Sequence, residues 1–330
     1  MSEPTLDVLT IGNALVDVLS HEQDAIIDRL DLIKGTMAMV DGARSDAVYA
    51  ALGPGIEVSG GSAANTATGI ASFGGSAGFV GRIGKDQFGQ VFAHDLATIG
   101  VTFDPDGSST SGPTGKCLVI VTPDAQRTMC TSLGVAGDLA PEHIPSDVVA
   151  SARVTYLEGF LWDQPTAKEA FRTAARGAHD AGRQVALSLS DPFCVDRHRG
   201  DFLELIEGQI DVLFANEDEI CSLYEVDDFD AALQRVRHHC SIAALTRSER
   251  GAVIVAGDEV HVVDAHPVDT VIDTTGAGDQ YAAGFLHALT AGRDLAACGR
   301  RGALAASEVI GHLGARPEVS LADLAVAHGA

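Results

Sequence analysis

The chain has 330 residues, of which 46% are hydrophobic, and its formal net charge is −24. This length and apolar content can bury a large core, which excludes a disordered chain, and 36 glycines with few aromatic residues are typical of an α/β protein with tight turns. The negative charge argues against nonspecific binding to nucleic acid or to an anionic membrane, although backbone amides and a few cations can still bind a phosphate ligand.

The cysteines and the first residues indicate the cellular setting. The six cysteines are scattered without a Cys-x-x-Cys pair, and Met1–Pro4 lacks a basic region followed by an apolar run. No apolar run reaches the roughly 18–20 residues that a membrane span requires. We therefore expect free thiols and a cytoplasmic protein whose partners are small molecules, with no nucleic acid and no membrane.

The first predicted strand is the apolar run Leu6–Ile11, and a polar turn follows it. Ligands collect at the carboxyl ends of strands in an open α/β sheet, so Asn13 and Asp17 are either substrate contacts or turn residues. Only one glycine, Gly12, follows the strand, which argues against the Gly-x-Gly-x-x-Gly turn of a nicotinamide-dependent dehydrogenase. Next we predict a helix over 21–32, a strand over 36–40 and a helix over 45–52.

A glycine pair, Gly60 and Gly61, opens the next predicted helix. These glycines let a flat or polyhydroxyl ligand approach the backbone, and Asn65, one turn into the helix, can hydrogen-bond such a ligand. The alternative is that the pair serves tight packing between a helix and a strand. Farther along we predict a strand over 77–81, a helix that ends at Ile99, and a strand that begins over 100–103.

A predicted β-hairpin, over 114–121 and 127–133, interrupts the alternation of strands and helices. A β element inserted into an α/β body is a candidate lid. Arg127, at the start of its second strand, either reaches over an active site or is a solvated arginine beside a turn. We expect one domain, residues 1–330, with a β lid contributed by about 14–20, 35–41 and 113–134.

From Val154 onward strands and helices alternate. Such alternation predicts a mostly parallel sheet with helices on both faces. No linker-like stretch divides the chain. Strands are predicted over 154–157, 185–189, 210–214, 242–245, 252–255 and 260–263, and helices over 165–181, 202–207, 230–239, 279–291 and 295–312, with a further helix that ends at 223.

The run Asp273-Thr274-Thr275-Gly276-Ala277-Gly278-Asp279 is a glycine-rich turn that opens a helix. Free amides and the positive end of the helix dipole make such a turn a natural anion site, and its two glycines permit a close approach. Asp279 would accept a proton from a hydroxyl while the amides hold a transferring phosphoryl group. Otherwise Asp279 is an ordinary acid at a helix N-terminus.

A second acidic cluster, Asn216 to Glu219, follows another predicted strand. Asn216 and Glu219 lie three residues apart on one helix face, where they could orient a hydrated Mg²⁺ ion, which needs only one or two carboxylates. The chain lacks both the Gly-x4-Gly-Lys-[Ser/Thr] loop and the protein-kinase loop motifs. A phosphotransferase with this sequence must therefore use another scaffold.

Two signatures and a short motif point to one family. The signatures are Gly-Gly-Ser-Ala-Ala-Asn at 60–65 and Asp-Thr-Thr-Gly-Ala-Gly-Asp-Gln-Tyr-Ala-Ala-Gly-Phe at 273–285, and the motif is Asn-x-x-Glu at 216–219. With these motifs in the right order, essentially the whole chain resembles the ribokinase-like (PfkB) family of sugar and nucleoside kinases. The resemblance implies a ribokinase-like parallel-sheet core with helices on both faces and a small β-sheet lid.

The resemblance also implies catalytic roles. Gly276, Ala277 and Gly278, with the amide of Asp279, would form an anion hole. Asp279 would be the general base for the acceptor hydroxyl. Arg127 would be a lid arginine that approaches the transferred phosphoryl group.

The remaining site residues follow from the same resemblance. The substrate would contact Asn13, Leu15, Asp17, Met37, Gly60, Gly61, Asn65, Met129 and Phe160. ATP would contact Asn216, Thr246, Ser248, Gly251, Val263, Ala303 and Ser307. Glu219 would hold Mg²⁺ through water, and a monovalent cation such as K⁺ would lie near Asp273 and Thr275.

Part of the sequence bears on the acceptor. Gly12–Asp17 and Arg127–Cys130 are similar to the matching segments of family members that phosphorylate adenosine, and Leu15, Met37 and Met129 with Phe160 could sandwich a purine. We expect transfer of the γ-phosphoryl group of Mg-ATP to the 5′-hydroxyl of adenosine or a similar nucleoside. The alternatives are a ribokinase- or fructokinase-like sugar kinase and a non-catalytic nucleoside-binding regulator, which the intact Asp279 disfavours. The enzyme would be a monomer or a homodimer.

Overall fold

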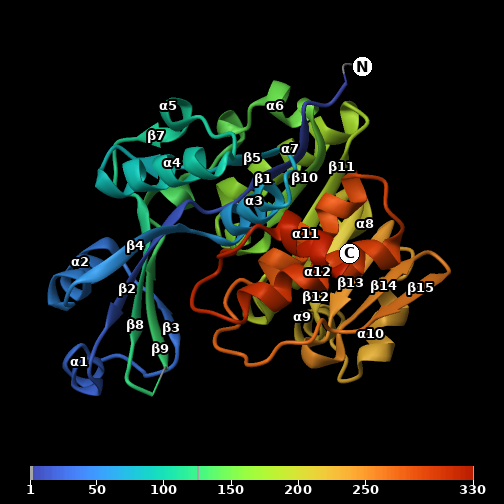
Figure 1. Ribbon diagram of the computed structural model, residues 1–330. Helices are drawn as coiled ribbons and strands as arrows, with labels where there is room; N and C mark the ends of the chain where they lie inside the picture. Colours follow the sequence, from blue (N-terminus) through green and yellow to red (C-terminus); the bar gives the residue numbers. More distant parts are fainter. Residues whose placement is uncertain (1–2, 125, 330) are drawn as a thin grey trace.

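The computed structural model describes residues 3–124 and 126–329. Met1 and Ser2 of the N-terminal stretch, Ala125 in the hairpin turn, and Ala330 at the end of the expected domain lie outside the described residues. The chain forms an α/β body with a second, smaller sheet beside it (Figure 1). None of the helices in the described ranges is long and apolar enough to cross a membrane.

The body is built on an eight-stranded sheet with the strand order β15-β14-β13-β12-β11-β10-β1-β5. All pairs from β5 to β13 are parallel, while β14 and β15 add an antiparallel edge. This confirms the predicted parallel core. The strands are β1 (Leu6–Ile11), β5 (Ala77–Val80), β10 (Ala152–Glu158), β11 (Gln184–Ser188), β12 (Val212–Asn216), β13 (Ile242–Thr246), β14 (Ala252–Ala256) and β15 (Glu259–Val263).

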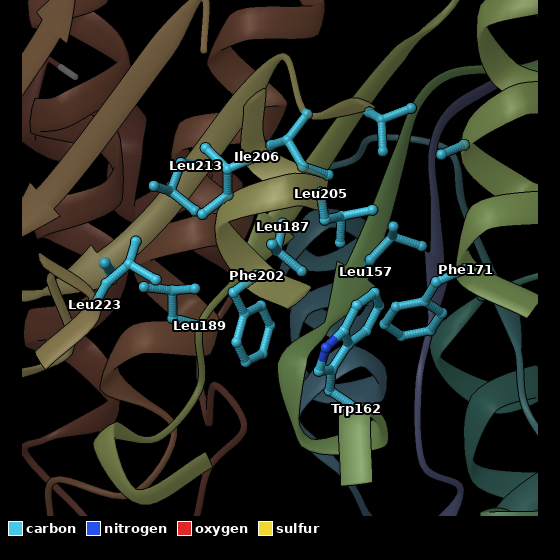
Figure 2. Packing of buried hydrophobic residues seen from close by; sticks show 14 of the residues in the cluster. Leu157, Trp162, Phe171, Leu187, Leu189, Phe202, Leu205, Ile206, Leu213 and Leu223 are labelled. Carbon is cyan, nitrogen blue, oxygen red and sulfur yellow. The ribbon is translucent and has the colours of Figure 1, made fainter. Parts of the chain in front are cut away.

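Helices cover both faces of this sheet, because its central strands are apolar on both sides. On one face a buried cluster surrounds Trp162, whose ring stacks on Phe202 at a centroid distance of 5.3 Å (Figure 2). That face carries α6 (Ser146–Ser151), α7 (Pro165–Asp180), α8 (Pro192–Gln209), α9 (Glu217–Tyr224) and α10 (Phe229–Val236). The other face carries α3 (Ser62–Ser72), α4 (Gln87–Ile99), α11 (Ala277–Thr290) and α12 (Leu295–Val309), against which α13 (Leu321–His328) packs.

The smaller sheet has the strand order β3-β9-β8-β2-β4. One of its faces packs on α1 (Asp24–Arg29) and α2 (Gly42–Ala51) through a cluster that includes Val18, Leu118 and Ile120. The sheet and these two helices lie beside the body (Figure 1), and the predicted hairpin is confirmed as β8 and β9. The strands are β2 (Leu15–His21), β3 (Met37–Met39), β4 (Gly55–Gly60), β8 (Gly115–Val121) and β9 (Arg127–Ser132).

The short elements complete the chain. They are β6 (Ile83–Gly84), β7 (Ser109–Thr110), α5 (Pro105–Ser108) and 3-10 turns at Gly134–Asp138, Pro141–His143, Gly159–Asp163 and Ser248–Arg250.

Several predicted elements were wrong in extent. The helix predicted over 21–32 covers only Asp24–Arg29, because β2 runs to His21 and Asp31 takes a left-handed φ of 49°. The strand predicted at 100–103 is a single bridge between Gly78 and Thr102. The helix predicted over 202–207 begins at Pro192, and non-helical angles at His198 interrupt its periodicity. β4 and α13 were missed, and β2 was expected only as the lid segment over 14–20.

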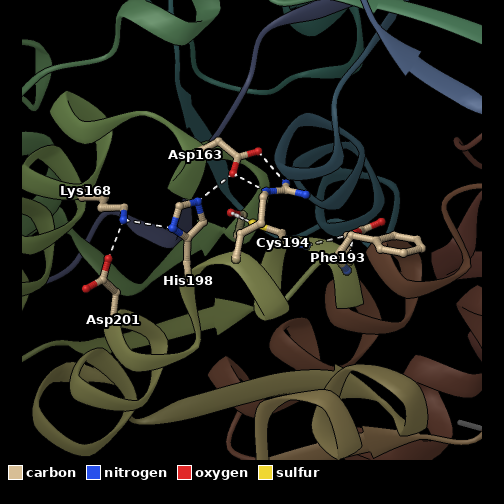
Figure 3. Close-up of polar contacts among 9 residues, drawn as sticks. Asp163, Lys168, Phe193, Cys194, His198 and Asp201 are labelled. Carbon is tan, nitrogen blue, oxygen red and sulfur yellow. Dashed lines mark hydrogen bonds and ion pairs between the residues drawn. The ribbon is translucent and has the colours of Figure 1, made fainter.

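A polar network fixes the first half of α8 (Figure 3). Asp163 accepts hydrogen bonds from Arg197 Nη2 at 2.7 Å and lies 2.7 Å from His198 Nε2. Lys168 pairs with Asp201 and lies 3.2 Å from His198 Nδ1. These contacts join a 3-10 turn, α7 and α8, and so hold the start of α8 at the carboxyl edge of the sheet.

Candidate functional site

Asp279 lies in the first turn of α11, and two side chains of α3 hold its carboxylate. Ser62 Oγ donates to Oδ1 at 2.6 Å, and Asn65 Nδ2 donates to Oδ2 at 3.0 Å. Burial raises the pKa of Asp279, and the hydrogen bonds from Ser62 and Asn65 oppose that rise. The carboxylate is therefore oriented and has an increased affinity for a proton, as a general base requires.

The turn before Asp279 has the geometry of an anion site. Gly276, the N-cap of α11, has a φ of 78°, and a Cβ there would lie 2.6 Å from the Cβ of Ala315, so only glycine fits. Within the described chain the amides of Gly276, Gly278 and Asp279 have no hydrogen-bond acceptor. They lie at the positive end of a 14-residue helix, where an anion is stabilised.

Asn13 and Asp17 present acceptor oxygens near Asp279, whose charge also acts on Asp17. Asn13 Nδ2 donates to Glu158 at 2.9 Å, but its buried Oδ1 has no partner in the part of the chain that the structure describes. Within the same ranges Asp17 accepts no hydrogen bond, and burial raises its pKa to about 6 against the opposing charges of Arg316 and Arg127. Both groups are thus available to ligand hydroxyls.

Glu158, to which the sequence analysis assigned no role, contacts the side chain of Asn13. Its two carboxylate oxygens accept hydrogen bonds from Asn13 Nδ2 at 2.9 Å and from the Ala63 amide at 2.8 Å. Burial raises the pKa of Glu158 to about 7, although these two donors oppose the rise. Glu158 therefore joins the turn after β1 to the N-terminus of α3.

Gly60 and Gly61 permit a close approach between backbone segments. A Cβ at Gly61, where φ is 97°, would lie 2.1 Å from the carbonyl oxygen of Asn13, and a Cβ at Gly60 would lie 2.4 Å from Asp17 Oδ2. These contacts are with strand β2 and with the turn after β1, not between a helix and a strand, and the role of both glycines in substrate binding stays a prediction. Their packing also brings Asn13, Asp17 and the start of α3 together.

The small sheet supplies one arginine and three apolar side chains. Arg127 Nη2 forms an ion pair with Asp273 Oδ2 at 2.6 Å, and its Nη1 donates to Thr275 Oγ1 at 3.0 Å, so β9 is tied to the anion-binding turn. Met37 and Met129 are opposite each other on β3 and β9. Leu15 is opposite Gly60 and Gly115, and Phe160 lies in the 3-10 turn after β10.

Asn216 and Glu219 cap α9 by binding each other. Glu219 accepts hydrogen bonds from the amide of Asn216 at 2.9 Å and from its Nδ2 at 2.7 Å, and burial raises the pKa of Glu219 to about 7. Within the described ranges no group of three His, Cys, Asp or Glu side chains could hold a metal ion. Because both carboxylate oxygens are engaged, this pair fits a hydrated ion better than a directly bound one.

The remaining predicted nucleotide contacts separate into two sets. Thr246 lies beside Asn216 on neighbouring strands, and the turn through Ser248 and Gly251 continues from it. Ser307 lines a cavity of about 370 Å³ between α12 and the 266–270 segment. Val263 packs its side chain into the core, and Ala303 is not among the residues that line this cavity.

Three contributors were missed by sequence reasoning. They are Ser62, Glu158 and Arg316. Ser62 lies inside the Gly60–Asn65 signature and Glu158 at a strand end, so both had a positional signal. Arg316 lies in the segment between α12 and α13, and nothing in its sequence surroundings pointed to the site.

These features define the class of the protein. An α/β body presents a helix N-terminus to an anion, places a buried carboxylate beside it, and carries a small sheet tied to the same turn. This is the arrangement of a phosphotransferase with an alcohol acceptor.

Comparison with known proteins identifies the family. Residues 55–321 match the pfkB family of carbohydrate kinases, and the chain belongs to that family. It is 27% identical over 313 residues to adenosine kinase of Saccharomyces cerevisiae, covering 88% of this chain and 91% of that protein. Kinases of this family bind a nucleoside or sugar together with ATP and a divalent metal.

Two solved structures are similar over nearly the full length of the chain. The probable sugar kinase of Rhizobium etli has a TM-score of 0.92 and 46% identity, with 99% of each chain covered. Adenosine kinase of Sinorhizobium meliloti has a TM-score of 0.90 and 47% identity, covering 98% of this chain and 99% of that one. The predicted ribokinase-like fold is thus confirmed.

Proposed function

We propose that this chain transfers the γ-phosphoryl group of Mg-ATP to the 5′-hydroxyl of adenosine or a closely similar nucleoside. One observation carries the proposal: Asp279, held by Ser62 and Asn65, lies directly beside free amides at the N-terminus of α11. A general base next to an anion site serves a reaction in which a hydroxyl loses a proton as it attacks a phosphoryl group.

The steps follow from this geometry. Asp279 accepts the proton of the acceptor hydroxyl while the new O–P bond forms and the bond to the β-phosphate breaks, which releases ADP. The amides of Gly276, Gly278 and Asp279 hold the charge that develops on the transferred group, whereas the Ala277 amide already donates to the Thr274 carbonyl at 3.2 Å. Arg127, tied to the same turn, would move its guanidinium to that group when substrates bind.

The acceptor side favours a nucleoside. Asn13 and Asp17 offer acceptor oxygens to ribose hydroxyls, while Leu15, Met37 and Met129 with Phe160 offer apolar surface to a purine. The similarity to adenosine kinase of Sinorhizobium meliloti supports this choice. A sugar kinase is the second candidate, because the probable sugar kinase of Rhizobium etli is similar to nearly the same degree.

The ions belong to the proposal as well. Mg²⁺ would be held through water by Glu219, with Asn216 fixing that carboxylate, and would neutralise phosphate charge when bound. A monovalent cation such as K⁺ would lie near Asp273 and Thr275. Ser307 and the cavity beside α12 would receive the base of ATP.

A coupled ADP-release assay tests the proposal. The protein would be given Mg-ATP with adenosine, inosine, ribose or fructose, each across a range of concentrations. We expect the highest kcat/KM with adenosine and AMP as the product. A higher kcat/KM with ribose or fructose would replace the nucleoside assignment by a sugar kinase, and the absence of ADP release with all four would contradict the proposed reaction.

A further inference from the structure

Arg316 is a largely buried arginine beside the proposed catalytic base, and its guanidinium contacts α3. Its Nε donates to Asn65 Oδ1 at 3.2 Å, and its Nη1 donates to Ser59 Oγ. Burial lowers the pKa of Arg316 to about 10, while the charges of Asp17 and Asp95 oppose that fall. An arginine has no neutral form near pH 7, so burying it requires compensating contacts, and these lie on the site.

The contacts of Asn65 fix the orientation of its amide. Arg316 can only donate, so the atom that faces it must be the oxygen, and the carboxylate of Asp279 can only accept, so the atom that faces it must be the nitrogen. In the flipped orientation the amide oxygen of Asn65 would face Asp279 and its nitrogen would face Arg316, so both hydrogen bonds would be lost. Without Arg316, flipping the amide would cost only the hydrogen bond to Asp279. Arg316 therefore selects the orientation in which Asn65 donates to Asp279.

We propose that Arg316 is a positioning residue for phosphoryl transfer: through the Asn65 amide it orients the Asp279 carboxylate toward the acceptor hydroxyl. This inference rests on the proposed function. Phosphoryl transfer depends on in-line placement, so a small rotation of the base slows the chemical step while leaving ATP binding intact.

The surrounding structure allows Arg316 to be replaced without loss of its segment. Gln280 Nε2 donates to the Ala315 carbonyl at 3.0 Å, and the Gly314 amide donates to Asp273 at 2.9 Å. These two contacts hold the backbone just before Arg316, and the Glu318 amide, which donates to Glu308 at 2.9 Å, holds the chain after it, all independently of the guanidinium. A change at Arg316 therefore tests the side chain rather than the fold of the loop.

The experiment is a double-mutant cycle on the full chain with adenosine and Mg-ATP. Arg316→Met and Arg316→Lys are compared with Arg300→Met, a control that removes an exposed arginine from α12. We expect both Arg316 variants to lower kcat roughly ten- to a hundredfold with an unchanged KM for ATP, and Arg300→Met to match the wild type. In an Asn65→Ala background Arg316→Met should cause no further loss, since its route to Asp279 is already gone.

Other results would overturn the inference. An unchanged kcat in Arg316→Met would show that Arg316 does not position the base, and an equal loss in the Asn65→Ala background would show that Arg316 does not act through Asn65. If adenosine is not phosphorylated, the proposed acceptor fails, and the cycle is run with the acceptor that the ADP-release assay finds. Whichever acceptor is used, the midpoints of urea unfolding are compared for the wild type, Arg316→Met, Asn65→Ala and the double variant. Their shifts should be non-additive, and additive shifts would show that Arg316 and Asn65 do not interact.

Discussion

At the residue scale, three carboxylates of the site differ in the donors that surround them. Asp279 has two side-chain donors at the opening of the site, Glu158 has two donors inside the core, and within the described chain Asp17 has none. A carboxylate with fixed donors has a fixed direction, whereas one without donors is free to bind ligand hydroxyls. Neutralising each of these three carboxylates should therefore have a different effect on activity or stability.

Replacing Asp279 by Asn should remove the general base while preserving its shape. We expect kcat to fall by about two to four orders of magnitude, with ATP affinity within about threefold of the wild type. Steady-state kinetics and calorimetric titration with ATP measure the two effects. Asp258→Asn, at an exposed position in the turn between β14 and β15, is the matched control. Near-normal turnover in Asp279→Asn would remove Asp279 from the mechanism.

Glu158→Gln should change how stability depends on pH. The pKa of Glu158 is raised from 4.5 to about 7, so its contribution to stability is fully present below pH 4.5 and is lost as the pH rises through 7. Relative to the variant, the wild type should lose on the order of 3 kcal/mol of unfolding free energy between pH 4.5 and pH 8.

Urea unfolding of both proteins at several pH values measures this difference. Glu204→Gln, which changes an exposed carboxylate on α8, controls for the loss of one charge and should follow the wild type. Parallel pH profiles for the wild type and Glu158→Gln would show that folding does not raise the pKa of Glu158.

At the element scale, the junction between β4 and α3 brings the acceptor side and the base together. Gly61, the N-cap of α3, has a φ of 97°, and a Cβ there would lie 2.1 Å from the carbonyl oxygen of Asn13. From there α3 carries Ser62 and Asn65 to Asp279 on α11. The position of the base relative to Asn13 therefore depends on a single backbone turn.

Gly61→Ala should displace this junction. Two costs combine. Alanine at the φ of 97° and ψ of 132° of Gly61 costs on the order of 1–3 kcal/mol. Its Cβ would also lie 2.1 Å from the Asn13 oxygen, which is part of the backbone and has little room to move. Gly74→Ala is the matched control, because Gly74 also has a positive φ, 84°, but has nothing within 4 Å of its Cβ position.

Unfolding free energies and kcat are measured for both glycine variants. We expect Gly74→Ala to lose only the backbone cost and to keep its activity, and Gly61→Ala to lose more stability and most of its kcat. Equal losses of stability in the two proteins, with activity retained in both, would show that the junction can relax.

The sequence made most of the body predictable, because buried parallel strands are continuous apolar runs and the helices between them are amphipathic. The strands of the small sheet were harder to predict. β4 contains two glycines and forms only because β2 pairs with it, and β2 carries Leu15 and Leu19 on the face that also bears Asp17. Tertiary pairing, rather than local preference, decides such strands.

The site was predictable only where its residues lie within motifs. Asn13, Asn65 and Asp279 were predicted as site residues, but some of their contacts come from far away in the chain: Glu158 contacts Asn13 across 145 positions, and Arg316 contacts Asn65 across 251. No local periodicity encodes such contacts. A buried arginine in a connecting segment has the same sequence appearance as a solvated one.

At the scale of the whole molecule, an ion pair joins the small sheet to the body of a protein with a large negative net charge. Arg127 and Asp273 form the ion pair between β9 and the anion-binding turn. The net charge is −24, and like charges at this density repel one another in the compact state. Salt should therefore act on the fold as a whole as well as on individual pairs.

Raising the ionic strength should stabilise the protein. At 0.1 M salt the screening length is about 10 Å, so repulsion across the surface weakens, while the buried pair of Arg127 and Asp273 is screened much less. We expect Tm to rise by a few degrees between low salt and 0.15 M. Thermal unfolding in NaCl, KCl and tetramethylammonium chloride at equal ionic strength measures the rise. Since screening depends on ionic strength alone, the three salts should give the same increase in Tm. An additional increase in KCl alone would come from specific binding of K⁺, for which the turn at Asp273 and Thr275 is the proposed place. A fall in Tm in all three salts would contradict the prediction, because favourable ion pairs would then outweigh the repulsion expected from the net charge.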